Sequence, residues 1–308
     1  MKYLSVCSGI EAASVAWNPL GWTPVGFSEI DPFACSVLSF RFPEVQNFGD
    51  LTQNRNWVLN GPIDILVGGT PCQSFSRSGD RKGLKDLRSQ LVFCFIELAS
   101  RLKPSWIVWE NVPFVLSSNQ GQDFEQILEA LEELGYGLAW RTLDAQYVRV
   151  DGFERALPQR RRRLFLVGSL GTQGCKQVLF NRKSNQYCFS TVKKQKEVGA
   201  ELGNGFKSDS TFSTWWDGNV ISSTITRSLD EQFMPDKFAF NAVIHNSLVR
   251  RLTPREFERL QGFPDDWTLV HHRGRLAYDK PRYKAIGNSM AVNCIRWIGR
   301  GIETVAKV

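Results

Sequence analysis

The sequence predicts an α/β fold in which helices cover a mainly parallel β-sheet. Short apolar runs alternate with amphipathic helical patterns over residues 1–168, and this alternation is typical of such sheets. Several apolar runs end in glycine or an acidic residue, as expected where strands deliver loops to a binding edge. With 308 residues, 42% of them hydrophobic, the chain can form one large domain and a smaller one.

The individual elements of residues 1–168 follow from these patterns. Strands are expected at Leu4–Cys7, Pro24–Ser28, Ile63–Val67, Trp106–Trp109, Gly137–Leu143 and Arg163–Gly168. Helices are expected at Glu11–Trp17, Phe33–Arg41, Ser89–Leu102 and Asp123–Leu134. Because parallel strands end at one edge of a sheet, the loops that follow them are expected to gather there.

The rest of the chain divides into two regions. Residues 169–248 are rich in Lys, Ser, Thr, Asn and Gly and have weak apolar periodicity, which indicates a small irregular second domain. Residues 249–308 return to regular patterns. They predict a helix over Pro254–Leu260 with Thr253 as its cap, a basic loop over His271–Lys284 and a terminal helix over Met290–Val305.

Charge and cysteine content narrow the class of protein. The net charge of +7 favours a polyanionic partner, although a basic solvated surface gives the same number. The seven cysteines are odd in number and form no C-x-x-C pair, so a disulfide scaffold or zinc site is not expected, and a reducing cytoplasm fits better. The N-terminus does not resemble a signal peptide, and no run has the length of a membrane span.

Two strand-end loops carry residues suited to chemistry. Cys72 follows an apolar run through two glycines, and Glu110 ends the run at residues 106–109. A lone cysteine is often a small buried hydrophobe, and a lone glutamate is often half of a surface ion pair. A Gly- and Ser-rich loop is a poor place to bury a thiol, so the context favours Cys72 as a nucleophile.

Three further loops indicate a nucleoside cofactor. Gly9, after the first strand, allows a ligand to approach the backbone closely. Glu29, after the second strand, can accept hydrogen bonds from ribose hydroxyls, whereas Asp31 is the expected cap of the next helix. Asp50 is a third acidic group, able to accept a bond from an exocyclic amine.

The order of these motifs resembles that of the cytosine carbon-5 DNA methyltransferases of bacterial or bacteriophage type. The matching segments are Cys7–Ala13, Ser28–Asp31, Gly49–Thr52, Pro71–Gln73, Glu110–Val112, Gln159–Arg163, Arg251–Glu256, Leu260–Pro264 and Tyr283–Val292. They span the chain apart from residues 169–248, and their joint order is highly specific.

The resemblance implies a Rossmann-like S-adenosylmethionine-dependent methyltransferase sheet with a small irregular target-recognition domain. Residues 1–168 would be the catalytic and cofactor-binding domain, and residues 169–248 the target-recognition domain. Residues 249–308 would form a hinge to that domain and a terminal helix that returns to the catalytic domain. S-adenosylmethionine would be the donor, S-adenosylhomocysteine the product, and no metal is expected.

The implied reaction is methyl transfer to carbon 5 of a cytosine flipped out of duplex DNA. Cys72 would attack carbon 6 while Glu110 holds or donates a proton at ring nitrogen 3. Arg161 and Arg163 are expected to lie on one face of their strand and to supply positive charge for the Cys72 thiolate. Asn111 is expected to shape the loop backbone rather than take part in the reaction.

The resemblance also implies sets of binding residues. Cofactor contacts are expected at Cys7, Ser8, Gly9, Ile10, Glu11, Glu29, Ile30, Asp50, Leu51, Pro71, Leu91, Asn288 and Ser289. DNA contacts are expected at Gln73, Ser76, Arg77, Ser78, Arg81, Lys82, Thr224 and Arg227. The implied partner is double-stranded DNA, acted on by a monomer, with a cognate restriction endonuclease as a further partner where the enzyme belongs to a restriction-modification system.

Two features depart from the family pattern. The family usually has an aromatic residue at the position of Cys7, so adenine packing has to come from elsewhere, with Ile30 or Leu51 as candidates. The segment Val148–Leu157 is longer than the usual link, and its charged residues suggest an exposed excursion in a position to touch DNA.

Other functions remain open from the sequence alone. An RNA cytosine methyltransferase on the same scaffold is one alternative, although the Cys-Phe-Thr tripeptide of the branch that modifies transfer RNA is absent. A non-catalytic DNA-binding relative is another, and the presence of both Cys72 and Glu110 argues against it. A nicotinamide oxidoreductase would need G-x-G-x-x-G after the first strand, and the sequence there lacks it.

Overall fold

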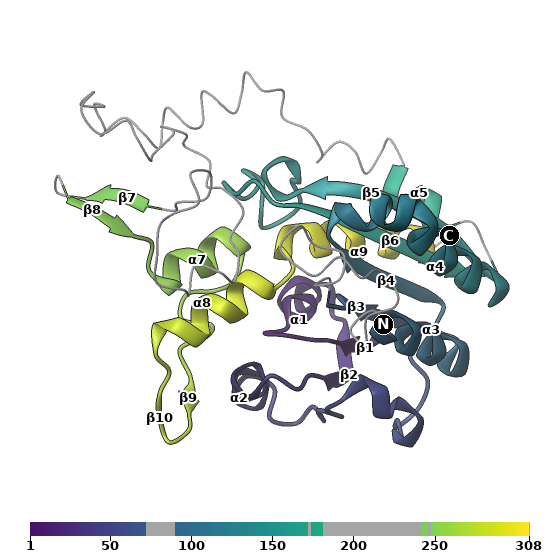
Figure 1. Ribbon diagram of the computed structural model, residues 1–308, viewed down its shortest axis with the longest axis horizontal. Helices are drawn as coiled ribbons and strands as arrows, with labels where there is room; N and C mark the ends of the chain where they lie inside the picture. The colour runs from purple at the N-terminus through teal and green to yellow at the C-terminus, as the bar shows by residue number, and fades with distance from the viewer. Residues whose placement is uncertain (72–89, 172–173, 181–241, 246–247, 308) are drawn as a thin grey trace.

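A six-stranded sheet forms the centre of the protein (Figure 1). The computed structural model describes residues 1–71, 90–171, 174–180, 242–245 and 248–307. The strands, in spatial order, are β2 (Thr23–Ser28), β1 (Lys2–Val6), β3 (Ile65–Gly68), β4 (Trp106–Asn111), β6 (Arg162–Leu170) and β5 (Tyr136–Asp144). The first four run parallel, and β6 is antiparallel to both of its neighbours. The predicted strands and the mainly parallel sheet are confirmed.

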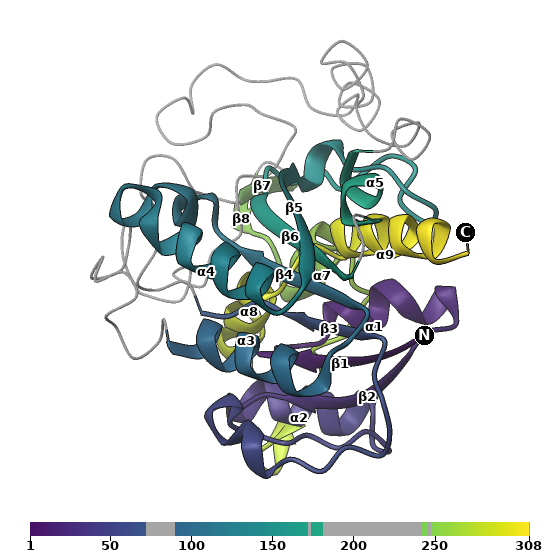
Figure 2. The same ribbon diagram turned by 90° about the vertical axis from the view of Figure 1, so that its right-hand side faces the viewer.

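Helices cover both faces of the sheet (Figure 2). Alternate strand residues enter different cores: Tyr3 and Ile65 pack into one, whereas Leu4 and Leu66 pack into the other, as the period of two requires. On the first face lie α1 (Ala12–Trp17), α2 (Pro32–Arg41), α5 (Gly174–Phe180) and α9 (Val292–Ala306). On the second face lie α3 (Gln90–Leu102), α4 (Gln122–Glu133) and the 3-10 turn η2 (Leu51–Asn56). The predicted helices of this region are therefore confirmed.

Shorter elements connect these layers. Further 3-10 turns are η1 (Asn18–Leu20), η4 (Pro113–Gly121) and η5 (Ala145–Tyr147). A two-stranded ribbon of β7 (Ala242–His245) and β8 (Leu248–Arg251) leads into α7 (Pro254–Gln261). Thr253 caps α7 as predicted, and its hydroxyl and backbone both bond to Glu256 in a capping box. Most of residues 169–248 lie outside the described residues, so their role as a separate domain stays a prediction.

The edge formed by the carboxyl ends of the parallel strands also receives the start of β6. Because β6 is antiparallel to β4, Asn111 at the end of β4 pairs with Leu164 near the beginning of β6. This register carries Arg163 and Arg161 to the same edge as Glu110, although about 50 residues separate them in the chain.

Residues 271–284 correct one expectation. A loop was expected from their basic composition, but they form a tight hairpin, β9 (His271–His272) and β10 (Arg275–Leu276), followed by the start of α8 (Asp279–Asn288). Arg273 and Gly274 occupy the turn with φ of 52° and 78°, as a two-residue hairpin turn with positive φ at both positions requires. The turn chemistry was hidden because Arg rarely occupies that region.

The segment 148–157 corrects another expectation. It was expected to be an exposed excursion, but Val148, Val150 and Leu157 are buried in the core on the α9 side of the sheet. Asp151 forms ion pairs with Arg296 at 3.0 Å and Arg300 at 2.8 Å, both on α9. The charge of Asp151 therefore anchors the terminal helix, whereas Glu154 and Arg155 of the same segment are exposed.

Candidate active site

The loops after β1 and β2 form a hydrogen-bonded unit around Glu29. Its Oε2 accepts the Gly9 N–H at 2.7 Å, and its Oε1 accepts the N–H groups of Ile30 at 2.8 Å and Asp31 at 2.7 Å. Ser8 joins the same unit, because its N–H and hydroxyl both reach the Ser28 carbonyl. Glu29 thus fixes the backbone of both loops, while Asp31 caps α2 as predicted.

Asn47 ties the third loop to this unit, a role that sequence reasoning missed. Its Oδ1 accepts the N–H groups of Glu29 at 3.0 Å and Gly49 at 3.1 Å. The Gly49 carbonyl in turn accepts a bond of 2.7 Å from the Ser28 hydroxyl. The structure therefore brings the loops of Gly9, Glu29 and Asp50 together. The signal for Asn47 is weak, because an Asn before a Phe-Gly pair reads only as turn chemistry.

The candidate cofactor residues differ in what they expose. Ile30 is 68% exposed beside the Glu29 loop, whereas Leu51 is 3% exposed within the core, so Ile30 offers the larger apolar surface. Asp50 is exposed and caps η2 through the Thr52 N–H. Gly9, with φ of 56°, has open space where a Cβ would stand. These loops thus leave room, apolar surface and a carboxylate where a nucleoside group can bind.

Cys7 and Glu11 flank Gly9 in the loop after β1, and Cys7 is half-buried whereas Glu11 is buried. Burial, reinforced by the charge of Glu29, raises the pKa of the Cys7 thiol, so this cysteine stays neutral. Glu11 is buried with φ of 65° and caps α1, its Oε1 accepting the Ser14 N–H and hydroxyl at 3.1 Å. Burial raises the pKa of Glu11 to about 7 despite these bonds. Ile10 is buried between them, and Trp267, far along the chain, donates to its carbonyl at 2.8 Å.

Glu110 and Arg163 form an enclosed ion pair at the end of β4. Their Oε1 and Nε atoms are 3.2 Å apart, and both side chains are largely buried. Burial raises the pKa of the Glu110 carboxyl, and the charges of Arg163 and Arg161 oppose that shift without cancelling it. The site therefore holds a carboxyl group whose proton is retained to a higher pH than usual.

Arg161 is almost fully buried and supports the segment after α8. It donates to the carbonyl oxygens of Gly287 at 3.1 Å and Ser289 at 2.6 Å. Asn288 lies between them at the exposed end of α8, while Ser289 is buried. Arg161, directly before β6, and Arg163 are more buried than the exposed Arg160 and Arg162, as alternation predicts, but each has its own bonding partners.

The loop that leads to Cys72 is fixed from β4. The Trp109 indole donates to the Thr70 hydroxyl at 3.0 Å, and the Asn111 amide donates to the Thr70 carbonyl at 3.4 Å. Asn111 also accepts the Val112 N–H at 2.8 Å, which confirms its expected role in shaping backbone. A Cβ at Gly69 would lie 3.2 Å from Glu110 Oε2, so this glycine lets the loop pass close to the carboxyl.

Several predicted site residues lie outside the described residues. Pro71, half-buried, is the last described residue before the gap, and Leu91 lies in the first turn of α3 beyond it. The predicted residues within the gaps are Cys72, Gln73, Ser76, Arg77, Ser78, Arg81, Lys82, Thr224 and Arg227. Their expected roles stay predictions.

Metal and membrane features can be stated for the described part of the chain. No group of three or more His, Cys, Asp or Glu side chains there has an arrangement that could hold a metal ion. No helix among the same residues is both long and apolar enough to cross a membrane.

Comparisons with known proteins agree with this architecture. The sequence matches the family described as C-5 cytosine-specific DNA methylase over residues 1–215 and 176–304. The crystal structure of the Schizosaccharomyces pombe Dnmt2 methyltransferase superimposes with a TM-score of 0.69 at 19% identity, covering 99% of each chain. The likeness of this structure shows the fold: a Rossmann-like sheet of the methyltransferase type.

Relatives identified by sequence alone add a finer comparison. A protein of Escherichia phage P1 named DNA N-6-adenine-methyltransferase is 33% identical over 96% of this chain, which spans 60% of the phage protein's length. The type II methyltransferase M2.BsuMI of Bacillus subtilis is 30% identical over 98% of this chain and 75% of its own. The chain belongs to the family of cytosine carbon-5 DNA methyltransferases, which are S-adenosylmethionine-dependent enzymes.

Proposed function

We propose that this protein transfers a methyl group from S-adenosylmethionine to carbon 5 of a cytosine in duplex DNA. The observation that carries the proposal is the enclosed Glu110–Arg163 pair, held beside the loop that leads to Cys72. This pair supplies a carboxyl of raised pKa at the place where the nucleophile's loop begins. That combination suits a reaction in which a thiolate attacks as a ring nitrogen is protonated.

The donor would bind over the loops after β1 and β2. Ile30 offers an exposed apolar side chain for the adenine, which would compensate for the aromatic residue that is missing at position 7. Asp50 offers a carboxylate. The Glu29 carboxylate accepts the three N–H groups that shape the site, and these bonds hold it in place to accept a hydrogen bond from a ribose hydroxyl. When bound, the donor supplies an electrophilic methyl group on a sulfonium.

Glu110 would act on nitrogen 3 of the cytosine. A protonated Glu110 can donate there, which withdraws electrons from the ring as the Cys72 sulfur forms a bond to carbon 6. Carbon 5 then takes the methyl group, which leaves S-adenosylhomocysteine as the product. A base removes the carbon-5 proton, the carbon–sulfur bond breaks to return the thiolate, and the nitrogen-3 proton goes back to Glu110. Arg163, within 3.2 Å of Glu110, stabilises the carboxylate each time that its proton has been given up.

Arg161 would act as a positioning residue in this reaction. Its bonds to Gly287 and Ser289 hold the segment after α8 against the start of β6. Met290, at the end of that segment, lies 3.1 Å from where a Cβ on Gly69 would stand. The segment after α8 and the loop that leads to Cys72 are thereby held beside each other.

The target base would have to leave the duplex, because carbon 5 and carbon 6 are not accessible to a thiol inside the stack. Residues 73–82 would meet the DNA beside the vacated position. Thr224 and Arg227, within the proposed target-recognition domain of residues 169–248, would contact the bases or backbone of the recognised word. A monomer suffices for this reaction, and a cognate restriction endonuclease is an optional partner.

The proposal is tested by methyl transfer from labelled S-adenosylmethionine to duplex DNA, with transfer RNA as a parallel substrate. The expected result is label in DNA as 5-methylcytosine, lost in Cys72→Ala and retained in Cys94→Ala, which removes a half-buried thiol on α3. Label found only in RNA overturns the DNA assignment. Label recovered as N6-methyladenine, the product implied by the name of the phage P1 relative, overturns the cytosine assignment.

A further inference from the structure

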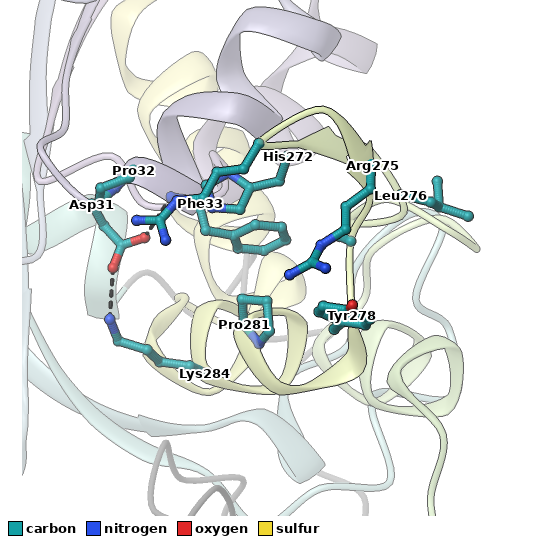
Figure 3. A pocket seen from close by; sticks show the side chains of 11 residues that line it. Asp31, Pro32, Phe33, His272, Arg275, Leu276, Tyr278, Pro281 and Lys284 are labelled. Carbon is teal, nitrogen blue, oxygen red and sulfur yellow. Dashed lines mark hydrogen bonds and ion pairs between the residues drawn. The ribbon is translucent and has the colours of Figure 1, made fainter.

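A basic pocket lies where the β9–β10 hairpin meets α2 and α8 (Figure 3). Its volume is about 310 Å³, and the charged groups around it are Arg273, Arg275 and Lys284 together with Asp31. Lys284 and Asp31 pair with each other at 2.7 Å, so the two arginines supply the net charge of the pocket. No ion-pair partner for either arginine is found within the part of the chain that the structure describes.

The hairpin is held firmly enough to form a defined site. His272 bonds to the Ser36 hydroxyl at 2.8 Å, and its ring meets the edge of Phe33, so the hairpin is fixed to α2. The Arg275 guanidinium stacks on the Tyr278 ring, 4.1 Å from its centroid. Figure 3 shows Arg275 reaching into the space beside Phe33 and Pro281. An arginine oriented in this way loses little freedom on binding and presents its donors in a planar fork.

We propose that this pocket binds a backbone phosphate of the DNA substrate, away from the base that is methylated. The proposal rests on the proposed function, because it takes duplex DNA as the ligand. Planar guanidinium groups match phosphate oxygens with paired hydrogen bonds, and a phosphate with its sugar fits the volume and the apolar wall of the pocket.

Sheet topology places the pocket at a distance from the reaction. The pocket adjoins the start of α2, directly after β2, and β2 is three strands away from β4, which carries Glu110. Three strand spacings are about 14 Å, and successive phosphates along one strand advance by about 3.4 Å of helix axis. With the duplex axis running across the strands, as the proposal takes it, the contacted phosphate lies roughly four or more base pairs from the target base, and a duplex trimmed close to the target should not reach the pocket.

The experiment measures the affinity of the full chain for duplex DNA over a series of salt concentrations. The test variant is Arg273→Gln with Arg275→Gln. The matched control is Lys2→Gln with Lys103→Gln, which removes the same charge from exposed positions at the edge of the sheet opposite to the carboxyl ends of the parallel strands. Lys2 begins β1, and Lys103 lies between α3 and the start of β4.

On a long duplex, the test variant should lower the slope of log K against log salt by about 1 to 2 and weaken binding roughly three- to tenfold at low salt. The control should change both by much less, and the effect should disappear on the trimmed duplex. Arg273→Lys with Arg275→Lys should restore most of the slope, which separates lost charge from a damaged fold.

Two results overturn the proposal, and a third concerns the function beneath it. If wild type binds duplex DNA and the test variant behaves like the control, the pocket does not bind a phosphate. If the test variant instead loses affinity for S-adenosylmethionine with its DNA slope unchanged, the pocket supports the cofactor loop. If wild type itself binds no duplex DNA, the proposed function has failed, whatever the variants do.

Discussion

Two carboxylates, Glu29 and Glu110, show how this sheet edge separates binding from reaction. Glu29 accepts three backbone N–H groups and thereby fixes the loops on which a nucleoside can lie. Glu110 is enclosed, pairs with Arg163 at 3.2 Å, and keeps a raised pKa. The N–H groups that bond to Glu29 belong to the loop backbone, so these bonds cannot break unless the loop moves. Glu110 has an ion-pair partner instead, so its carboxyl can gain or lose a proton while the backbone stays in place. The difference teaches that bonding partners, rather than residue type, assign these two roles.

The largest expected effect comes from Glu110→Gln. An amide of the same shape cannot exchange a proton with the base, so the methyl-transfer rate should fall by about 10² to 10⁴. Affinity for S-adenosylmethionine should stay within about twofold, because the donor site depends on the other carboxylate. Single-turnover rates and equilibrium binding measure the two quantities separately. Glu97→Gln, a change on α3, is the matched control and should alter neither; equal losses in rate and affinity for Glu110→Gln would contradict the comparison.

Glu11→Gln tests the buried carboxyl on the binding side through stability. The folded-state pKa of Glu11 is about 7 and its ordinary value is 4.5, so the folded protein keeps a proton that the unfolded chain has released. Its contribution to stability is therefore fully present below pH 4.5 and is lost as the pH rises through 7. The loss amounts to about 3 kcal/mol.

The glutamine variant lacks this titration. The difference in unfolding free energy between variant and wild type, measured in urea, should therefore shift in favour of the variant as the pH rises from 5 to 8. A difference that is independent of pH would show that Glu11 does not titrate in this range.

Arg163 on β6 and Arg161 directly before it should differ in how their loss changes the unfolding free energy. Arg161→Met removes charged donors from two buried carbonyls and should lower the unfolding free energy by about 2 to 3 kcal/mol, with a weaker pH dependence than Arg163→Met because Arg161 is the weaker of the two charges that act on Glu110. Arg163→Met should cost less, and least at low pH, because Glu110 can then take up a proton in place of the lost partner. Thermal denaturation of both variants at pH 5 and pH 8 checks this, and a stronger pH dependence for Arg161→Met than for Arg163→Met would reverse the assignment.

The smallest effect is expected for Glu29→Gln. The amide keeps an accepting oxygen but turns a donor toward the loop N–H groups, so the loops after β1 and β2 should loosen. We expect about a tenfold weaker affinity for S-adenosylmethionine, equivalent to one or two hydrogen bonds, with the rate of the bound complex little changed. Isothermal titration measures the affinity. A rate loss as large as that of Glu110→Gln would remove the distinction between the two carboxylates.

Sequence reasoning predicted those features that depend on neighbouring residues. The strands, the caps at Asp31 and Thr253, and the inward direction shared by Arg161 and Arg163 all follow from local patterns, and the structure confirms them. The order of motifs also identified the family, which the comparisons confirm.

Contacts between distant segments could not be predicted from one sequence. The bond from Trp267 to Ile10 joins residues 257 positions apart, and nothing near either residue indicates the other. The charges of segment 148–157 suggested solvent, because the partners of Asp151 lie on α9. Likewise, the basic composition of residues 271–284 concealed a hairpin, since its turn uses an arginine at positive φ.

The bonds from Arg161 to Gly287 and Ser289 also have a consequence for protein synthesis. These carbonyls belong to residues added 126 and 128 positions after the arginine. A nascent chain that has reached the end of β6 already contains Glu110 and Arg163. It still lacks the two carbonyl oxygens to which Arg161 donates in the finished protein. A translation product that stops before residue 287 would leave a buried guanidinium without these acceptors. The buried surroundings of Arg161 can therefore be completed only late in synthesis, after the segment that follows α8 has been added.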